Sequence, residues 1–317
     1  KKLIKQAKNV GASAIKFQTF IAKKSISKFA QKANYQVTST GNKKSQLEMC
    51  EDLELNSKEH FEMLAECKKN KIEFISTPFD KESIDLLVNM KVKKIKVASS
   101  ELNNYPFLKQ IALTKKDIFL STGMGTLKEI RNAVNLFKEY KVPKNKITIL
   151  HCNTEYPTPF EDANLQAIST IKDNFRLNVG YSDHTIGIEA SLAAVVLGAT
   201  VIEKHFTLDR NLPGPDHKAS IEPFEFKNLV SGIRNIEKAL GDGIKKPSKS
   251  EKKNILVARK SIVANSTIKK GDVFTEDNIT IKRPGNGISP IFYNKVLGLK
   301  SNKDYVEDEL IKLKKFK

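Results

Sequence analysis

Two histidines, His184 and His205, each end a short apolar segment rich in β-branched and aromatic residues. If these segments are neighbouring parallel strands, the two imidazoles meet at one end of the sheet. There they would form a divalent metal site that stays open to water and substrate. A lone histidine is as often structural as functional, but both stand beside carboxylates, Asp183 and Glu203, and this pairing favours a metal site. A closed zinc site is not expected, because neither a third histidine nor a cysteine stands at a matching strand end.

The positions of the other histidines are predicted from their neighbours in the sequence. His60 lies in a polar helical pattern and is expected on the surface, whereas His151 can point away from the site. His217 belongs to the loop segment Pro213–His217, which lies above the strand ends and within reach of a ligand.

Glu203 is predicted to share a face with His205, because side chains two positions apart in a strand point the same way. A carboxylate beside a metal-bound imidazole can orient a sugar hydroxyl or relay a proton. The alternative is a surface pair between Glu203 and Lys204, which does not explain why the acidic residue faces the same way as His205.

Two lysines, Lys16 and Lys96, are each placed near the end of a predicted strand. A buried lysine is unfavourable unless it pairs with an anion, and a phosphate or carboxylate ligand would supply one. A turn formed by Ser121, Thr122 and Gly123 opens a helix and suits oxyanion binding. Together these features predict a cavity for an anionic, hydroxyl-rich ligand. The sequence contains no P-loop, dinucleotide fingerprint or nucleophile elbow.

The elements that position these residues alternate between strand and helix. Amphipathic helical patterns lie between most of the apolar segments, for example Ser83–Met90, Leu127–Tyr140 and Phe224–Leu240. Such alternation predicts parallel β/α units, and polar residues at nearly every strand end favour a (β/α)8 barrel over an open doubly wound sheet. The seven predicted strands are Ser13–Phe20, Ile72–Ser76, Lys94–Ala98, Ile118–Ser121, Ile147–Cys152, Leu177–Ser182 and Thr200–His205.

Seven strands are one fewer than such a barrel requires. The chain opens on an amphipathic helix, Lys1–Val10, so we expect the first barrel strand to be missing from this sequence. We predict a barrel over residues 1–244, a polar linker over 245–256 and a small, mostly β domain over 257–317. Short β-like segments in the last part are Ser261–Ala264, Asp272–Phe274 and Ile279–Lys282.

Composition narrows the class of protein. The net charge of +19 could indicate a nucleic-acid-binding protein. The lysines are spread along the whole chain without interleaved aromatic residues, so solvated helix faces are the favoured explanation and no nucleic-acid partner is expected. The longest mostly apolar stretch, Ala190–Ile202, is shorter than the ~20 residues that span a bilayer, so no membrane span is expected. Three widely spaced cysteines indicate a reducing cytoplasm.

With these residues in view, the chain resembles the sialic acid synthases, and among them the bacterial N-acetylneuraminate synthases. The resemblance runs through essentially the whole chain, and its last part is similar to the SAF, or antifreeze-like, domain. The matching motifs include KFQTF (Lys16–Phe20), FISTPFD (Phe74–Asp80), SSELNNYP (Ser99–Pro106), LSTGM (Leu120–Met124), HCNTEYPTPFED (His151–Asp162), GYSDHT (Gly180–Thr185), IEKHFTLD (Ile202–Asp209), GPDHKAS (Gly214–Ser220) and KRPGNGIS (Lys282–Ser289). The family begins with a strand carrying EAG or EIG and NHNG motifs, and this sequence starts after it.

The resemblance implies specific roles for individual residues. We predict His184 and His205 as ligands of Mn2+, with Mg2+ or Co2+ as alternatives, and Lys96, Glu101 and Glu203 as catalytic residues. Arg283 of the small domain would reach into the partner's barrel in a domain-swapped homodimer. The residues predicted to hold phosphoenolpyruvate are Lys16, Lys96, Ser99, Ser121 and Ser182, and those predicted to contact the sugar or line its pocket are Gln18, Thr77, Tyr156, Glu203 and Asp216.

The implied reaction joins C3 of phosphoenolpyruvate to the aldehyde carbon of N-acetylmannosamine, whose oxygen the metal polarises. Water adds at C2 and phosphate leaves by C–O cleavage, giving N-acetylneuraminate. The alternative is a legionaminate or pseudaminate synthase, which runs the same chemistry on a diacetamido-6-deoxy sugar. A sugar-binding barrel without activity and a basic nucleic-acid-binding protein are the alternatives from other classes.

Overall fold

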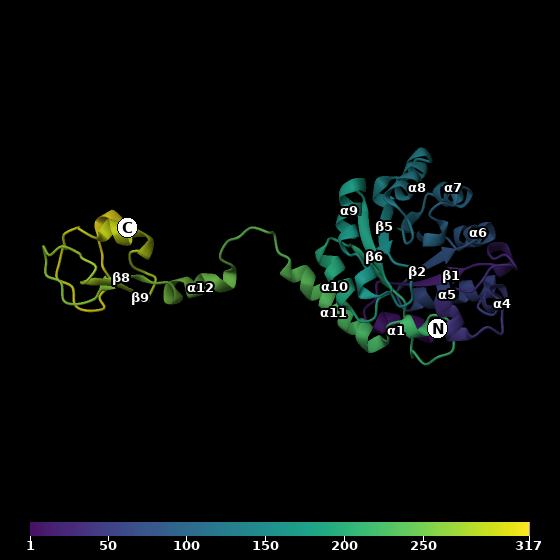
Figure 1. The fold of residues 1–317 in the computed structure, drawn as a ribbon, viewed down its shortest axis with the longest axis horizontal. Coiled ribbons are helices and arrows are strands. Elements are labelled where there is room, and N and C mark those ends of the chain that lie inside the picture. The colour runs from purple at the N-terminus through teal and green to yellow at the C-terminus, as the bar shows by residue number, and fades with distance from the viewer. Residues whose placement is uncertain (317) are drawn as a thin grey trace. The chain divides into compact units, whose positions relative to one another are not determined.

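The protein is described by a computed structural model that covers residues 1–316. The chain forms two compact units, Lys1–Gly241 and Asp242–Lys317 (Figure 1). Each unit has its own buried core and is described by itself. No helix in the described part is both long and apolar enough to cross a lipid bilayer.

The first unit is built on a parallel sheet whose seven strands pair in the order of the sequence. The sheet is curled, with helices over its outer face, as in a TIM barrel (Figure 1), so the predicted fold class is confirmed. All seven predicted strands are present within one or two residues of their predicted limits. They are β1 (Ala14–Thr19), β2 (Glu73–Pro78), β3 (Lys94–Val97), β4 (Asp117–Ser121), β5 (Ile147–Cys152), β6 (Asn178–Asp183) and β7 (Val201–Lys204).

Helices connect the strands, as parallel pairing requires. The three helical patterns named from the sequence are found in α6, α8 and α11. The helices of the unit are α1 (Lys2–Asn9), α2 (Ala22–Ser25), α3 (Asn34–Thr40), α4 (Gln46–Glu51), α5 (Ser57–Lys69), α6 (Lys81–Asn89), α7 (Tyr105–Leu113), α8 (Leu127–Glu139), α9 (Gln166–Phe175), α10 (Glu189–Val196) and α11 (Pro223–Ala239), with short 3-10 turns η1 (Ser99–Glu101), η2 (Lys144–Lys146), η3 (Phe160–Asp162) and η4 (His217–Ala219).

Helix α8 shows how local sequence sets an element. Thr126 caps its first turn by accepting a hydrogen bond from the backbone N–H of Glu129, whose side chain bonds back to the Thr126 backbone. This capping box satisfies backbone donors that a helix start leaves free. The apolar side chains that follow recur with a helical period and are buried against the sheet, namely Ile130, Ala133, Leu136 and Phe137.

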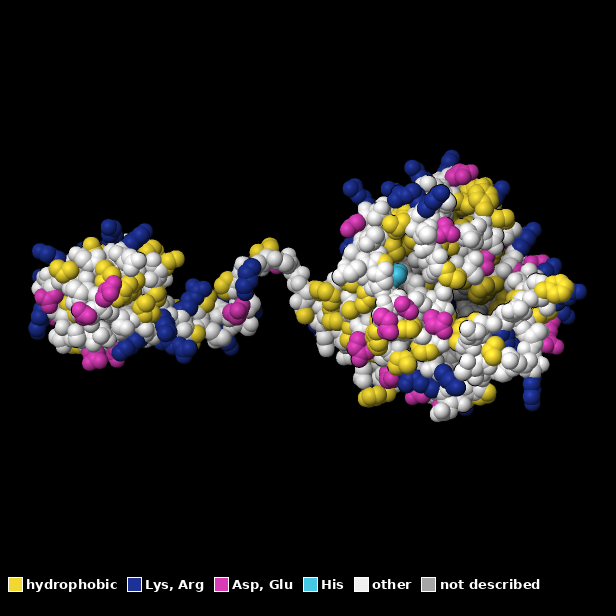
Figure 2. Space-filling model, viewed as in Figure 1, with side chains coloured by type: hydrophobic (Ala, Val, Ile, Leu, Met, Phe, Trp, Pro, Cys, Tyr) yellow, Lys and Arg dark blue, Asp and Glu magenta, His cyan; other side chains and the backbone are white. Residues whose placement is uncertain are grey.

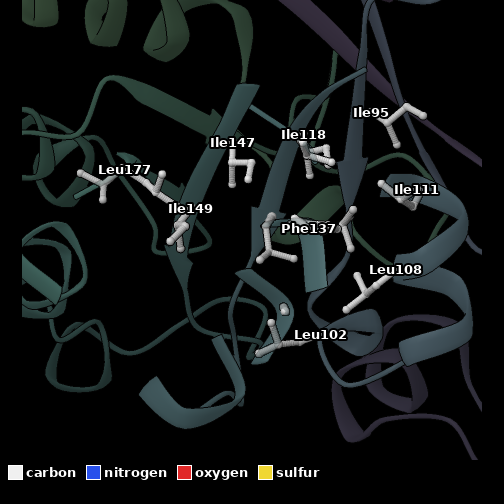
Figure 3. Close-up of a cluster of buried hydrophobic side chains, with 14 of the residues drawn as sticks. Ile95, Leu102, Leu108, Ile111, Ile118, Phe137, Ile147, Ile149 and Leu177 are labelled. Carbon is white, nitrogen blue, oxygen red and sulfur yellow. The ribbon is translucent and has the colours of Figure 1, made fainter. Parts of the chain in front are cut away.

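The core lies between the outer face of the sheet and the surrounding helices. Figure 3 shows Ile118 of β4, Ile147 and Ile149 of β5 and Phe137 of α8 in one cluster of buried side chains. Each of these side chains is at most 2% exposed. This dry layer leaves the polar strand ends free to form a site at the carboxyl end of the sheet.

A cavity of about 550 Å³ lies along β1 and β7, the first and last strands in the sheet order. Apolar residues of α1 and α11 line part of it, including Ala7 and Leu229. At its polar end the cavity is lined by Lys16, Glu203 and His205. The cavity therefore leads to the residues in which the sequence predicts the chemistry.

The second unit begins with a helix and continues as a small β structure. The elements are α12 (Lys249–Ala258), β8 (Ser261–Ala264), β9 (Ile279–Lys282), η5 (Pro290–Phe292), α13 (Tyr293–Val296) and η6 (Lys314–Phe316). Strands β8 and β9 pair antiparallel, and Ile262, Phe274 and Tyr305 are buried in the core. The predicted segment Asp272–Phe274 contributes only an isolated bridge, between Val273 and Lys300.

Helix α12 begins within the segment that we predicted to be a polar linker, residues 245–256, and ends two residues beyond it, at Ala258. The start of the helix could be found in the sequence, because Ser248 and Glu251 stand at the spacing of a capping box and form one in the structure. None of its residues is buried in the described structure, so the local cap rather than packing defines this helix.

Candidate active site

Three polar side chains converge on one carboxylate oxygen inside the barrel. The ammonium groups of Lys16 and Lys96 lie 3.1 and 3.0 Å from Oε1 of Glu203. The hydroxyl of Ser182 donates to the same oxygen at 2.7 Å. The four residues come from β1, β3, β6 and β7, and the curl of the sheet brings their strand ends together. We call this group the lysine–glutamate cluster.

The cluster carries a net positive charge. Burial raises the pKa of Glu203, but the charges of Lys16 and Lys96 outweigh this effect and hold that pKa well below its usual range. Burial and the charge of Lys96 lower the pKa of Lys16, and Glu203 opposes them. One carboxylate shared by two ammonium groups leaves one charge without a counterion, so the cluster can take up a further anion.

The two predicted metal ligands lie next to each other. The ring centroids of His184 and His205 are 5.3 Å apart. Nδ1 of His184 lies 2.5 Å from the carbonyl oxygen of Asn153, and Nδ1 of His205 lies 3.7 Å from a carboxylate oxygen of Asp216. A bond from Nδ1 to a carbonyl leaves Nε2 as the acceptor atom, which is the arrangement found in metal-bound histidines.

Both imidazoles are held in the neutral form that binds metals. Burial lowers the pKa of His184 to about 4 and that of His205 well below its usual value. Among residues 1–316 no group of three or more His, Cys, Asp or Glu side chains is arranged as a metal site. Two neutral imidazoles that lie side by side fit a divalent ion whose coordination water or substrate would complete.

Aromatic rings form the wall beside the imidazoles. The ring of Tyr156 lies 4.2 Å from that of His184 and 5.4 Å from that of His205, centroid to centroid. The ring of Tyr35 of α3 lies 5.0 Å from that of Tyr156, again centroid to centroid. Tyr156 was predicted from the sequence, but Tyr35 received no role, because only the fold places α3 over the strand ends.

Two buried hydroxyls at the strand ends have no hydrogen-bond partner in the described structure: Thr77 Oγ1 and Ser121 Oγ. A buried polar group without a partner destabilises a protein by about 1–3 kcal/mol. Both residues were predicted to contact substrate, and a bound polar ligand would satisfy them.

The remaining predicted residues of the barrel are placed around this centre. Ser99 accepts a hydrogen bond from the backbone N–H of Gly123 at 3.0 Å, which joins the β3 end to the turn after β4. Gln18 of β1 is exposed and lines the cavity. The carboxylate of Glu101 accepts local hydrogen bonds from Asn104 and Ser100, and in residues 1–316 it makes none with the lysine–glutamate cluster.

The alternative interpretation of Glu203, a surface pair with Lys204, is not what the structure shows. Lys204 points to the opposite side of β7 and pairs with Asp183 at 2.9 Å. Asp183 also accepts hydrogen bonds from the side chains of Thr185 and Ser191. The network fixes the end of β6 from behind the site.

The prediction for His60 was wrong. Its side chain is fully buried, and Nε2 lies 2.9 Å from the hydroxyl of Thr19 in β1. A polar sequence context concealed a helix face that packs on the sheet. The ring of His151 stacks on Tyr181 and bonds the carbonyl oxygen of Ala163, whereas that of His217 bonds Thr207.

Arg283 follows β9 in the second unit and is exposed. That Arg283 reaches into the barrel of a partner stays a prediction. Figure 2 shows lysine and arginine side chains (dark blue) spread over both units rather than gathered in one stripe. This distribution agrees with lysine-rich solvated surfaces.

Comparisons with known proteins assign the chain to a group. The model of the NeuB family matches residues 3–245, and that of the SAF domain matches residues 259–317. The N,N'-diacetyllegionaminic acid synthase of Campylobacter jejuni is 55% identical over 98% of this chain and 93% of its own length. The synthase of the same name from Legionella pneumophila is 42% identical over 94% of this chain and 84% of its own length. The crystal structure of N-acetylneuraminic acid (sialic acid) synthetase from Leptospira borgpetersenii matches with a TM-score of 0.69 and 35% identity, covering 80% of this chain and 83% of that one.

Proposed function

We propose that this chain, which belongs to the NeuB family, is an N,N'-diacetyllegionaminic acid synthase. It would condense phosphoenolpyruvate with a 2,4-diacetamido-6-deoxy sugar and release phosphate. The observation that carries this proposal is the 55% identity to the Campylobacter jejuni enzyme over nearly the full length of both chains.

This choice differs from the product that we first expected from the sequence, N-acetylneuraminate. The relatives support the alternative better, since the N-acetylneuraminic acid synthetase of known structure is 35% identical. The match of HCNTEYPTPFED (His151–Asp162) and KRPGNGIS (Lys282–Ser289) suggested N-acetylneuraminate, whereas motifs such as KFQTF (Lys16–Phe20) belong to the phosphoenolpyruvate side of the site. Enzymes that share one substrate share its contacts, so such motifs do not discriminate between the sugars.

We propose that phosphoenolpyruvate binds at the lysine–glutamate cluster. The unbalanced positive charge there suits a phosphate and a carboxylate. The buried hydroxyl of Ser121 is available to donate to the same ligand, and Ser99 and Ser182 border it. Orientation by these fixed groups would supply much of the rate enhancement.

The sugar would bind on the side of the imidazoles, where Tyr156 and Asp216 lie. We propose Mn2+, with Mg2+ or Co2+ as substitutes, as the ion held by His184 and His205. When bound, such an ion supplies Lewis-acid polarisation of the aldehyde oxygen. Gln18 and Thr77 would line the sugar pocket, and Glu101 would stand near the reacting centre.

The proposed reaction balances without any oxidant or reductant. A bond forms between C3 of phosphoenolpyruvate and the aldehyde carbon, and the aldehyde oxygen becomes a hydroxyl. Water adds at C2, and the bond between C2 and the bridging oxygen breaks, so that oxygen leaves with the phosphate. Glu203 lies at the centre of the cluster, where its carboxylate would orient the attacking water or relay its proton.

The test is a substrate panel run on the purified protein with phosphoenolpyruvate and Mn2+. The panel contains the 2,4-diacetamido-6-deoxy sugar, its C4 and C5 stereoisomers, and N-acetylmannosamine. Phosphate release and product mass are measured for each sugar. We expect the highest kcat/KM for the precursor of N,N'-diacetyllegionaminic acid. A higher value for N-acetylmannosamine would restore the N-acetylneuraminate assignment.

The position of bond cleavage is tested with an isotope label. Phosphoenolpyruvate labelled with oxygen-18 at the bridging position should place the label in phosphate.

We further propose that the working enzyme is a homodimer in the cytoplasm, where phosphoenolpyruvate is produced. Arg283 would complete the partner's sugar pocket. Its guanidinium offers several fixed donors to a sugar hydroxyl or carbonyl.

A further inference from the structure

The connection between β1 and α5 is longer than any other strand-to-helix connection in the barrel unit. It spans residues 20–56 and contains α2, α3 and α4. Long loops at the carboxyl ends of barrel strands are where barrel enzymes place their substrate contacts. Helix α3 has no buried residue, so the protein core does not hold it.

Both ends of this connection are anchored. The backbone N–H of Ile21 donates to Asp80, and that of Ala22 donates to Glu54. Around α3 itself, Lys32 donates to the carbonyl oxygen of Gly41 at 2.9 Å, which closes the segment into a compact loop. The connection therefore presents α3 over the strand ends without burying it.

Tyr35 is the residue of α3 that contacts the site. Its ring packs on Tyr156, which in turn contacts both imidazoles. Burial raises the pKa of the Tyr35 phenol to about 12, and the charge of Asp216 acts in the same direction. The phenol is therefore protonated and lies on the side of the pocket that Asp216 borders.

Contacts between neighbouring side chains connect the lysine–glutamate cluster to Tyr35. Ser182 of the lysine–glutamate cluster neighbours His184, the ring of His184 neighbours that of Tyr156, and Tyr156 neighbours Tyr35. A sugar whose aldehyde carbon lies at the imidazoles directs its other end away from the lysines, along the two aromatic rings. In a 2,4-diacetamido-6-deoxy sugar this end carries a methyl group and an acetamido group, both of which pack well on aromatic faces.

We propose that Tyr35 is a specificity-determining residue that packs on the C6 methyl and C4 acetamido end of the sugar. This inference rests on the proposed function and adds a residue to it. N-acetylmannosamine carries hydroxyl groups at those two positions, so it would gain less binding free energy from contact with the aromatic ring of Tyr35. One methyl group in such a contact discriminates about 10–200-fold between substrates.

The experiment measures kcat/KM for both sugars, KM for phosphoenolpyruvate and thermal unfolding in three variants. Tyr35→Ala should lower the ratio of the two kcat/KM values, diacetamido sugar over N-acetylmannosamine, by about tenfold or more. KM for phosphoenolpyruvate should stay unchanged. Tyr35→Phe keeps the ring and should retain the preference. Phe29→Ala is the matched control, because Phe29 lies on the same connection and is 80% exposed.

The outcomes separate the two proposals. If the wild-type protein uses the diacetamido sugar and Tyr35→Ala leaves the ratio unchanged, the Tyr35 assignment is overturned and the proposed function stands. An equal loss for both sugars with a raised KM for phosphoenolpyruvate would also overturn it, since that pattern indicates general damage. If the wild-type protein does not use the diacetamido sugar, the proposed function fails and the Tyr35 assignment fails with it.

Discussion

Lys204 forms an ion pair with Asp183 that is almost completely removed from water, with side chains 2% and 0% exposed. The ammonium group of Lys204 also donates to the carbonyl oxygen of Thr185. Asp183 lies between Ser182 of the lysine–glutamate cluster and His184 in the sequence. The pair therefore connects the ends of β6 and β7 behind the site, on the opposite side of β7 from Glu203.

Removing one member of this pair should destabilise the fold strongly. Lys204→Met leaves the Asp183 carboxylate buried without its cation, and breaking a buried pair in this way costs about 3–5 kcal/mol. Urea denaturation followed by circular dichroism measures the change. Lys1→Met is the control, because the pair between Lys1 and Glu62 is exposed and should contribute little. Equal midpoints for the two variants would contradict the role of the buried pair.

Glu203 and Lys16 should respond differently to substitution, although they touch. Glu203→Gln removes the anion that competes for the lysines, so phosphoenolpyruvate should bind at least as tightly while kcat falls by about 10²–10⁴. Lys16→Met removes a cation and should weaken phosphoenolpyruvate binding. Calorimetric titration and steady-state kinetics separate the two effects. Lys94→Met serves as the control, since Lys94 pairs with Glu73 at the start of β3. Weaker binding in Glu203→Gln would exclude competition between the carboxylate and the substrate.

The hydroxyl of Ser121 should matter for the ligand and not for the fold. It is buried without a partner, so Ser121→Ala should leave the free energy of unfolding unchanged or slightly higher. The same change should weaken phosphoenolpyruvate binding by removing a hydrogen bond of about 0.5–1.5 kcal/mol, or more if the acceptor is charged. Ser76→Ala is the contrast, because the Ser76 hydroxyl lies 2.7 Å from that of Thr19 and its loss should destabilise the protein. A large destabilisation by Ser121→Ala would show that the hydroxyl has a structural partner.

Metal dependence follows from the imidazole pair. Chelation should abolish turnover, and Mn2+, Mg2+ or Co2+ should restore it. His184→Ala and His205→Ala should each weaken Mn2+ binding, which electron paramagnetic resonance measures directly without an activity assay. His151→Ala is the control, since the His151 ring bonds the carbonyl oxygen of Ala163. Undiminished Mn2+ binding in both site variants would exclude these rings as ligands.

The strands, and the faces on which their side chains lie, could be predicted because they depend on local rules. Side chains alternate along a strand, so Glu203 and His205 share a face and Lys204 takes the other. The sequence also indicated that Lys16 and Lys96 need an anion. It did not indicate that Glu203 meets both lysines, because that contact depends on the curl of the whole sheet.

What the sequence could not provide was long-range packing. His60 is surrounded by polar residues in the chain, yet its partner is Thr19, 41 residues earlier. Tyr35 lies in a short helix without a buried face, so no periodic pattern marks it. Its importance comes from the ring of Tyr156, which only the folded chain brings near. Such contacts are set by tertiary structure and leave no local signal.

Arg283 provides the test of assembly. It lies in a turn of the second unit, and residues 240–248 join the last barrel helix to α12. A linker of this length would let the second unit reach a neighbouring subunit. If the arginine acts in trans, Arg283→Ala should raise KM for the sugar much more than KM for phosphoenolpyruvate. Lys282→Ala is the matched control, because Lys282 pairs with Asp308 of its own unit.

Mixing two inactive variants distinguishes action in trans from action within one chain. A heterodimer of Arg283→Ala and His205→Ala chains contains one barrel with both imidazoles, and the other chain supplies an intact arginine to it. After subunit exchange, part of the activity should return, up to about half of the sites within each heterodimer. Heterodimers confirmed by native mass spectrometry that remain inactive would show that Arg283 serves its own barrel or has no part in the site.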